Sequence, residues 1–191
     1  MKKLFVLLFA ASAALSSLTA SAQTWTADKS HSKLGFSITH MMVSDVEGSF
    51  KTFESTIVSS KPDFSDAVIN LTADINSVNT EDEKRDGHLK SADFFDAEKY
   101  PKLTFKSTSI KKVAANKYKV NGQLTLHGVT KAVVLDAVLR GTTVNQAKKT
   151  VAGFKVTGTI KRADFALGTK YPNAMLSDEI ALNANTEFVK D

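Results

Sequence analysis

Cysteine is absent from the 191-residue sequence, and proline occurs only three times. A chain without cysteine has no disulfide framework, no thiolate metal site, no cysteine nucleophile and no cysteine to carry a lipid anchor. Its stability must therefore come from packing. The prolines, at positions 62, 101 and 172, all lie between the segments predicted below as strands, because proline cannot donate a hydrogen bond within a sheet.

Sequence motifs of the common enzyme and nucleic-acid-binding classes are missing as well. The four histidines, at positions 31, 40, 88 and 127, show neither H-x-H nor H-E-x-x-H spacing. No G-x-S-x-G, P-loop or dinucleotide-binding fingerprint occurs, and the scattered lysines form no basic stripe with interleaved aromatic residues. We therefore predict that the protein is not an enzyme and does not bind nucleic acid.

The longest hydrophobic run lies at the N-terminus. Two lysines precede an apolar stretch from Leu4 to Leu15, which leads to the small residues Ala20-Ser21-Ala22. This order predicts a signal peptide, residues 1–22, cleaved after Ala22, and one mature domain, residues 23–191. The run is too short for a membrane span, and no later stretch approaches about 18 apolar residues. We expect a soluble periplasmic protein that is not embedded in the membrane.

Beyond this segment, apolar and polar residues alternate, which is typical of strands with one face toward a core. Phe50 and Phe53 break the alternation, so we predict a bulge between them. Gly128 predicts a hairpin turn between two of the runs. Eight strands are predicted, with these inward-facing runs: Leu34, Phe36 and Ile38; Phe53, Ser55 and Ile57; Ala67 to Ile75; Leu103 and Phe105; Tyr118 to Leu126; Val133 to Leu139; Ala152 to Ile160; Ile180 to Phe188.

Short antiparallel strands with one apolar face either stack as a sandwich or close into a barrel, and closure removes the exposed edges. An eight-stranded barrel is about wide enough to hold one slender ligand, provided that small residues leave room inside. Small residues also occur where strands coil tightly, so a solidly packed interior stays open as an alternative. We predict an all-β, eight-stranded antiparallel barrel with a cavity at the small inward-facing positions: Ala73, Gly122, Ala137, Ala152, Gly158 and Ala184.

A polar stretch over residues 79–101 interrupts the strands. Thr80 and Glu83 have the spacing of a capping box, which predicts a helix from Thr80 to Leu89. This helix has little apolar face, because Leu89 is its only large hydrophobic residue, and the pair Phe94-Phe95 follows. The segment is either a polar lid, anchored by the aromatic residues over an apolar opening, or a solvated connector whose aromatic residues plug the core.

Two polar residues continue inward-facing runs at their ends. His40 follows Ile38, and Arg162 follows Ile160, at the same alternating spacing. They indicate either a polar mouth that contacts a ligand head group or the ordinary polarity of strand ends, because a slip of one residue would reverse the facing. Asp86 is either an acid or base or, more commonly for such residues, an exposed carboxylate paired with a basic side chain.

The order of several short fragments resembles the YceI-like family, and this resemblance covers nearly all of the predicted mature chain. Gly87 lies between Arg85-Asp86 and His88-Leu89, a spacing that the family allows. The fragments are Trp25…Asp28…His31-Ser32…Phe36…His40, Gly48-x-Phe50, Arg85-Asp86-x-His88-Leu89, Asp93-Phe94-Phe95-Asp96, Tyr100-Pro101-x-Leu103-x-Phe105-x-Ser107, Leu126-His127-Gly128-Val129-Thr130 and Arg162-x-Asp164-Phe165.

The resemblance implies a lipocalin-like barrel, usually periplasmic, whose elongated apolar cavity binds a polyisoprenoid or a similar long-chain amphiphile such as an isoprenoid quinone. It implies a carrier without a cofactor other than this ligand, and it leaves a homodimer open. Two alternatives remain: an enzyme that acts on a lipid or head group with His88 and Asp86 as acid and base, and an interaction module with a packed barrel.

We expect the ligand to contact seventeen residues. Leu89 and Phe94 are expected to contact the tail or the rim of the cavity. The other tail contacts are expected from Phe36, Ile38, Leu103, Phe105, Leu124, Leu126, Phe154, Val156, Ile160, Leu182 and Phe188, and head-group contacts from His40, Arg85, His88 and Arg162.

Overall fold

A computed structural model describes residues 21–191, so nearly all of the predicted signal peptide, residues 1–22, lies outside the described residues. Residues 21–191 are mostly strand, with one α-helix and three short 3₁₀ segments. The elements are β1 (Gln23–Ala27), η1 (Lys29–His31), β2 (Lys33–His40), β3 (Ser44–Phe50), β4 (Phe53–Ser59), β5 (Val68–Asp74), η2 (Ile75–Ser77), β6 (Val78–Asn79), α1 (Glu83–Lys90), β7 (Lys102–Ala114), β8 (Lys117–Leu126), β9 (Val129–Val144), β10 (Thr150–Lys161), η3 (Ala163–Phe165) and β11 (Leu176–Lys190).

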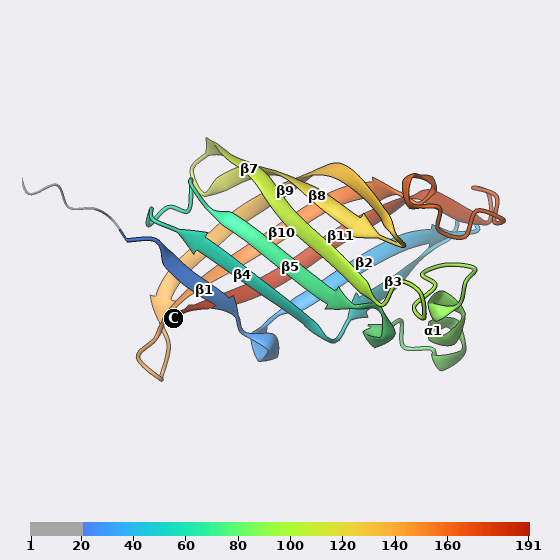
Figure 1. The fold of residues 1–191 in the computed structure, drawn as a ribbon, viewed down its shortest axis with the longest axis horizontal. Helices are drawn as coiled ribbons and strands as arrows, with labels where there is room; N and C mark the ends of the chain where they lie inside the picture. The colour runs from blue at the N-terminus through green and yellow to red at the C-terminus, as the bar shows by residue number, and fades with distance from the viewer. Residues whose placement is uncertain (1–20) are drawn as a thin grey trace, which may run out of the picture.

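The strands form one elongated, closed antiparallel barrel (Figure 1). Closure comes from β1, which pairs with β4 on one side and with β11 on the other. Around the barrel, two successive strands share one place in the wall at three points: β1 with β2, β3 with β4, and β5 with β6. β1 and β2 both pair with β11. β1 then pairs with β4 and β2 with β3, while β4 pairs with β5 and β3 with β6. The predicted eight-stranded antiparallel barrel is therefore confirmed.

The bulge predicted between Phe50 and Phe53 is instead a break between two strands. β3 ends at Phe50 and β4 begins at Phe53, and both rings are buried. The backbone N–H groups of Lys51 and Thr52 donate to the carbonyl and the hydroxyl of Ser77, 3.0 Å away in each case. The break thus turns the wall while both phenylalanines stay inside.

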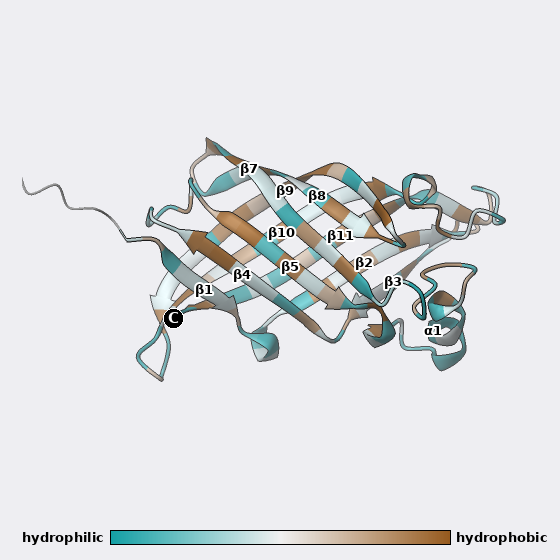
Figure 2. Ribbon diagram, viewed as in Figure 1, coloured by the Kyte–Doolittle hydropathy of each residue, from teal (hydrophilic) through white to brown (hydrophobic). Residues whose placement is uncertain are grey.

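Hydrophobic and hydrophilic residues alternate in bands along the strands, as the sequence pattern predicts (Figure 2). The inward faces form one continuous core that runs through the barrel, to which nearly every strand contributes. Because the sheet closes on itself, each strand buries one apolar face without leaving a long free edge.

Small inward-facing residues do not leave room in the way that the sequence suggests. An added Cβ at Gly122 would lie 2.3 Å from the ring of Phe105, and one at Gly158 would lie 2.5 Å from a methyl carbon of Leu135. Large neighbours therefore lie over these glycines and fill the space. Of the other small positions, Ala73 and Ala152 are completely buried, whereas Ala137 and Ala184 line the cavity described below.

Close approach at Gly122 makes a testable prediction about stability. In Gly122→Ala the new methyl group must displace the Phe105 ring and approach the Lys106 carbonyl oxygen, 2.7 Å from the ideal Cβ position. Overpacking of this kind costs about 1–3 kcal/mol, so the thermal midpoint should fall by several degrees.

Gly153→Ala is the matched control, because Gly153 is also a strand glycine but its ideal Cβ meets only the Arg140 Cβ, at 3.7 Å. This variant should keep or slightly raise the midpoint, as alanine usually does where a strand glycine has free space. Equal midpoints for the two variants would contradict the packing of Phe105 over Gly122.

Candidate functional site

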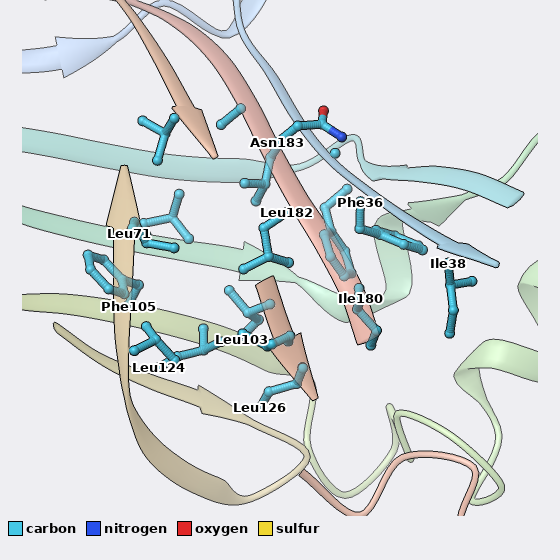
Figure 3. Close-up of a pocket in the computed structure, with 18 of the residues that line it drawn as sticks. Phe36, Ile38, Leu71, Leu103, Phe105, Leu124, Leu126, Ile180, Leu182 and Asn183 are labelled. Atoms are coloured by element: carbon cyan, nitrogen blue, oxygen red, sulfur yellow. The ribbon is translucent and has the colours of Figure 1, made fainter. Parts of the chain in front are cut away.

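The barrel encloses an apolar cavity of about 430 Å³ along its axis. Side chains from strands on all sides of the wall converge on it, among them Leu71, Leu103 and Leu182 (Figure 3). All seventeen residues that the sequence predicts as ligand contacts line this cavity: Phe36, Ile38, His40, Arg85, His88, Leu89, Phe94, Leu103, Phe105, Leu124, Leu126, Phe154, Val156, Ile160, Arg162, Leu182 and Phe188. Whether they contact a ligand stays a prediction.

Other cavity residues are absent from the predicted set, for two different reasons. Some belong to inward-facing runs and could have been included on parity alone, for example Leu34, Leu71 and Ile180. Others come from segments without periodicity, such as Phe64 before β5 and Tyr171 in the segment between β10 and β11. No sequence signal places these two residues inside.

One end of the cavity is plugged by aromatic side chains. Phe64 lies in the segment between β4 and β5, is 1% exposed and makes edge-on contacts with Trp25 and Phe154, with 5.1 Å between ring centroids in both cases. Phe154 packs in the same way on Phe188. The Tyr118 hydroxyl donates to the backbone carbonyl of Asp63 and holds the plug in place. This end carries the C-terminus (Figure 1).

The opposite end is more open. There the lining residues Phe36, Ile38 and Tyr171 are only half-buried, and His40 and Met175 are exposed. The β2–β3 turn, α1 and the segment between β10 and β11 all lie at this end (Figure 1). We call it the mouth. The cavity is thus an apolar tube that aromatic rings close at one end and that is open at the mouth.

Helix α1 begins later than predicted, and its cap is a different residue. Asp82 is the N-cap and accepts a hydrogen bond from the backbone N–H of Arg85, whereas Thr80 is buried outside the helix. The predicted capping box of Thr80 and Glu83 is therefore wrong. Both the N–H and the hydroxyl of Thr80 donate to Asp86 Oδ1, at 2.8 and 2.6 Å.

Asp86 is thus a buried structural carboxylate and is not exposed, because Thr80 satisfies it. Arg85 completes this cluster: its Nε donates to the Thr80 hydroxyl and its Nη2 to the Thr80 carbonyl, at 2.8 and 2.7 Å. Asp86 does not line the cavity. An acid and base pair of Asp86 with His88 therefore finds no support in this geometry.

A second polar cluster connects α1 to the segment between β10 and β11. His88 Nε2 lies 3.1 Å from Asp93 Oδ2 and 3.2 Å from the Tyr171 hydroxyl, and Lys170 Nζ lies 2.5 Å from the same Asp93 oxygen. Phe94 stacks on Tyr171 with ring centroids 5.3 Å apart. The ammonium of Lys170, followed by His88, lowers the pKa of the Asp93 carboxyl, so this carboxylate stays charged.

Arg162 is buried and organises the segment between β10 and β11. Its five N–H donors are directed at backbone carbonyls of five different residues, the closest being Gly168 and Leu167 at 2.6 and 2.7 Å from Nη1. The remaining donors reach the carbonyls of Tyr171, Leu176 and Ser177. With every donor engaged by the protein, this geometry favours a structural role over the predicted head-group contact.

Chemically, the described cavity offers an apolar surface with a few polar groups at its mouth. Among residues 21–191 no three His, Cys, Asp or Glu side chains are grouped so that they could hold a metal ion. In the same part of the chain, no helix has the length and apolar character needed to cross a membrane. The arrangement suits a long apolar molecule whose polar end stays near the mouth.

Replacing Arg162 tests its structural role. Arg162→Met should lower the free energy of unfolding by about 2–5 kcal/mol, because it leaves several backbone carbonyls of one segment without their donor. Arg162→Lys should fall in between, since an ammonium cannot reproduce the planar fork. Thermal and urea unfolding measure both.

Arg140→Met serves as the control, because Arg140 is exposed on β9. Its unfolding should match that of the unmodified protein. An unchanged stability of Arg162→Met, with only ligand binding weakened, would restore the head-group role.

Comparisons with known proteins agree with the barrel. The model of the YceI-like domain matches residues 25–188. A UPF0312 protein of Staphylococcus aureus strain N315 is 36% identical over 169 residues, which cover 86% of this chain and 96% of the relative. A UPF0312 protein of Photorhabdus laumondii is 41% identical over 135 residues, or 71% of this chain and 70% of the relative.

Solved structures show the same architecture. The YCEI protein of Campylobacter jejuni is 38% identical, with a TM-score of 0.74, and the match covers 80% of this chain and 90% of that one. BcnA of Burkholderia cenocepacia is 26% identical with a TM-score of 0.77, covering 84% and 98%.

A third structure, described as a polyisoprenoid binding domain from Saccharophagus degradans, is 18% identical with a TM-score of 0.67 over 87% and 98%, and supports the fold alone. Because the domain model spans nearly all of the described residues and the relatives exceed 30% identity, the chain belongs to the YceI-like family.

Proposed function

We propose that this protein is a binding protein that carries a long-chain isoprenoid lipid, such as a polyisoprenoid or an isoprenoid quinone, in its barrel. The observation that carries the proposal is the blind apolar cavity of about 430 Å³, which is plugged by aromatic rings at one end and opens at the other. Volumes of this size are typical of ligand pockets. The structural relative described as a polyisoprenoid binding domain has the same fold.

Burial of an apolar tail would supply enough free energy for useful affinity. Each buried CH₂ contributes about 0.8 kcal/mol, so ten tail carbons would contribute roughly 8 kcal/mol before ordering costs. Micromolar binding corresponds to about 8 kcal/mol net, so a tail with more than ten buried carbons would reach it. The walls need no specific polar contact for this. A linear tail fits because the cavity follows the barrel axis between the plug and the mouth.

The polar end of the ligand would lie at the mouth, where His40, Arg85 and His88 line the cavity. His40 and His88 are exposed, and Arg85 uses Nε and Nη2 for Thr80, so its Nη1 would face the head group. Residues 1–22 add a location to the proposal. Their signal-peptide pattern favours export, and with it a carrier role in the periplasm.

Native mass spectrometry of protein purified without detergent tests the proposal directly. We expect a co-purifying lipid whose mass fits an isoprenoid chain. The variant Val156→Trp places an indole ring inside the cavity and should reduce binding at least tenfold, because the ring occupies the volume of the tail.

Thr157→Trp is the matched control, since Thr157 is the next residue on β10, is exposed and does not line the cavity. It should bind like the unmodified protein. If no lipid is extracted and a fluorescent isoprenoid analogue binds neither the unmodified protein nor Thr157→Trp, the carrier proposal fails in favour of a packed interaction module.

Helix α1 and residues 91–100 lie at the mouth, so the proposal includes a lid that controls exchange. Leu89 lines the cavity and is the only large apolar side chain of α1. Leu89→Ala should raise the release rate of a fluorescent isoprenoid analogue several-fold while the thermal midpoint changes little, because few apolar contacts are lost.

Lys84→Ala changes an exposed residue of the same helix and should leave the release rate unchanged. A large fall in midpoint for Leu89→Ala, with release unaffected, would instead assign the segment to the alternative role of a core plug.

A further inference from the structure

Four exposed apolar side chains gather at the mouth. Met41, Met42 and Val43 form the turn between β2 and β3 and are 59%, 76% and 82% exposed, and Met175 is 47% exposed. The Met41 N–H donates to the Met175 carbonyl at 2.8 Å, which holds the two segments together. We call these four residues the apolar tip. The other large apolar residues that are exposed in the described chain lie on β5, β7 and β9: Val68, Val113, Val134 and Val144.

The backbone of the apolar tip is unfavourable for the residues that it carries. Met41 and Met42 have φ angles of 50° and 59°, and the Val43 N–H donates to the His40 carbonyl at 3.1 Å, as in a type I′ turn. Such turns favour Asn and Gly at the two central positions, because other L-residues are strained in the left-handed region. Methionine therefore gains little burial at either position, and the backbone conformation there disfavours it.

The apolar tip is continuous with the lining of the cavity. Met175 itself lines the cavity, and so do His40, which precedes the turn, and Leu176, which follows Met175. The apolar surface therefore extends from the barrel interior over the mouth to the outside. A lipid tail that leaves a bilayer at this point would meet the apolar side chains of Met175 and Leu176 on its way into the cavity.

We propose that the apolar tip inserts into a lipid bilayer and so places the mouth of the barrel against the membrane from which the ligand is taken. This inference rests on the proposed function for its purpose, although insertion itself does not require a bound ligand. Flexible, polarisable methionine side chains suit a fluid and irregular surface such as the boundary of head groups and acyl chains.

A second copy of the chain fits this surface less well than a bilayer. A stable protein–protein interface buries about 800 Å² on each partner, whereas four side chains at the end of a hairpin expose only on the order of a few hundred square ångströms. The turn between β2 and β3 lies at the end of the barrel, beside the segment between β10 and β11 (Figure 1). Four side chains at this end can enter a bilayer, but they offer little area to a protein partner.

The charges near the tip indicate which membranes it should bind. Residues 41–44 carry no charge, and the nearest charged residues along the hairpin are the acidic Asp45 and Glu47. Insertion should therefore depend on burial of apolar side chains and not on attraction to anionic lipids. Zwitterionic phosphatidylcholine vesicles should suffice, and added salt should change the binding little.

Quenching by brominated lipids tests the location of insertion. Val43→Trp should show a blue-shifted emission and strong quenching when mixed with vesicles of brominated phosphatidylcholine. Val144→Trp is the matched control, because Val144 is also an exposed valine at a hairpin but lies at the plugged end, opposite Thr150 of β10. The native Trp25, buried at the same plugged end, should stay unquenched.

A double substitution tests whether Met41 and Met42 are needed for membrane binding and not for folding. Met41→Asn with Met42→Gly gives the turn its favoured residues, so the thermal midpoint should stay equal or rise. Vesicle flotation of this variant should fall at least tenfold. Transfer of a fluorescent isoprenoid analogue from vesicles should slow by a similar factor, while binding of the analogue in vesicle-free solution should be unchanged.

The proposal would be overturned by no quenching of Val43→Trp, by equal flotation of the double variant, or by a dimer in sedimentation velocity that the double variant abolishes. Failure of the proposed function looks different. In that case the analogue would not bind in vesicle-free solution, whatever the flotation shows. A loss of midpoint in the double variant would also count against the proposal, because it would mean that the methionines serve the fold.

Discussion

The structure depends on a single constraint, which is that eight wall positions share one apolar interior and leave no long free edge. Once the sheet closes through β1, every inward-facing side chain points at the same axis, and the wall cannot be rearranged locally. The interior must then be filled by side chains or by a ligand. Rings such as Phe105 over Gly122 fill the wall layer, and a cavity of about 430 Å³ stays at the centre.

The two ends of the barrel are built from different kinds of side chain. At the plugged end, Phe64 and its aromatic neighbours exclude water by packing. At the mouth, buried polar residues order the irregular segments: Asp86 fixes Thr80 ahead of α1, and Arg162 gathers the carbonyls between β10 and β11. These side chains satisfy the hydrogen-bonding groups of the loops inside the protein, and apolar side chains are exposed at the mouth. The cavity is therefore closed by aromatic rings at one end and open at the other.

Much of this could be predicted from the sequence, because a strand has a period of two and parity identifies its inner face. Parity placed residues such as Phe36, Leu182 and Phe188 in the cavity lining, and its interruption after Phe50 predicted a bulge where the structure has a break between two strands. It failed where the chain has no period. The capping role of Asp82, the burial of Asp86 and the donors of Arg162 depend on partners that only the folded chain brings together. The argument from small residues also failed at Gly122, since a neighbouring ring fills the space.

The mouth shows how folding and function compete for the same residues. A hairpin turn such as Met41-Met42 is normally optimised for its backbone and an exposed position for its polarity, yet here both preferences are violated at once. The fold gives no compensation, because the side chains contact solvent and the strands β2 and β3 pair in regular register up to the turn. An interaction outside the protein must then offset the strained backbone and the exposed side chains. A lipid bilayer offers such an interaction, because it would bury the methionine side chains beside the mouth of the cavity.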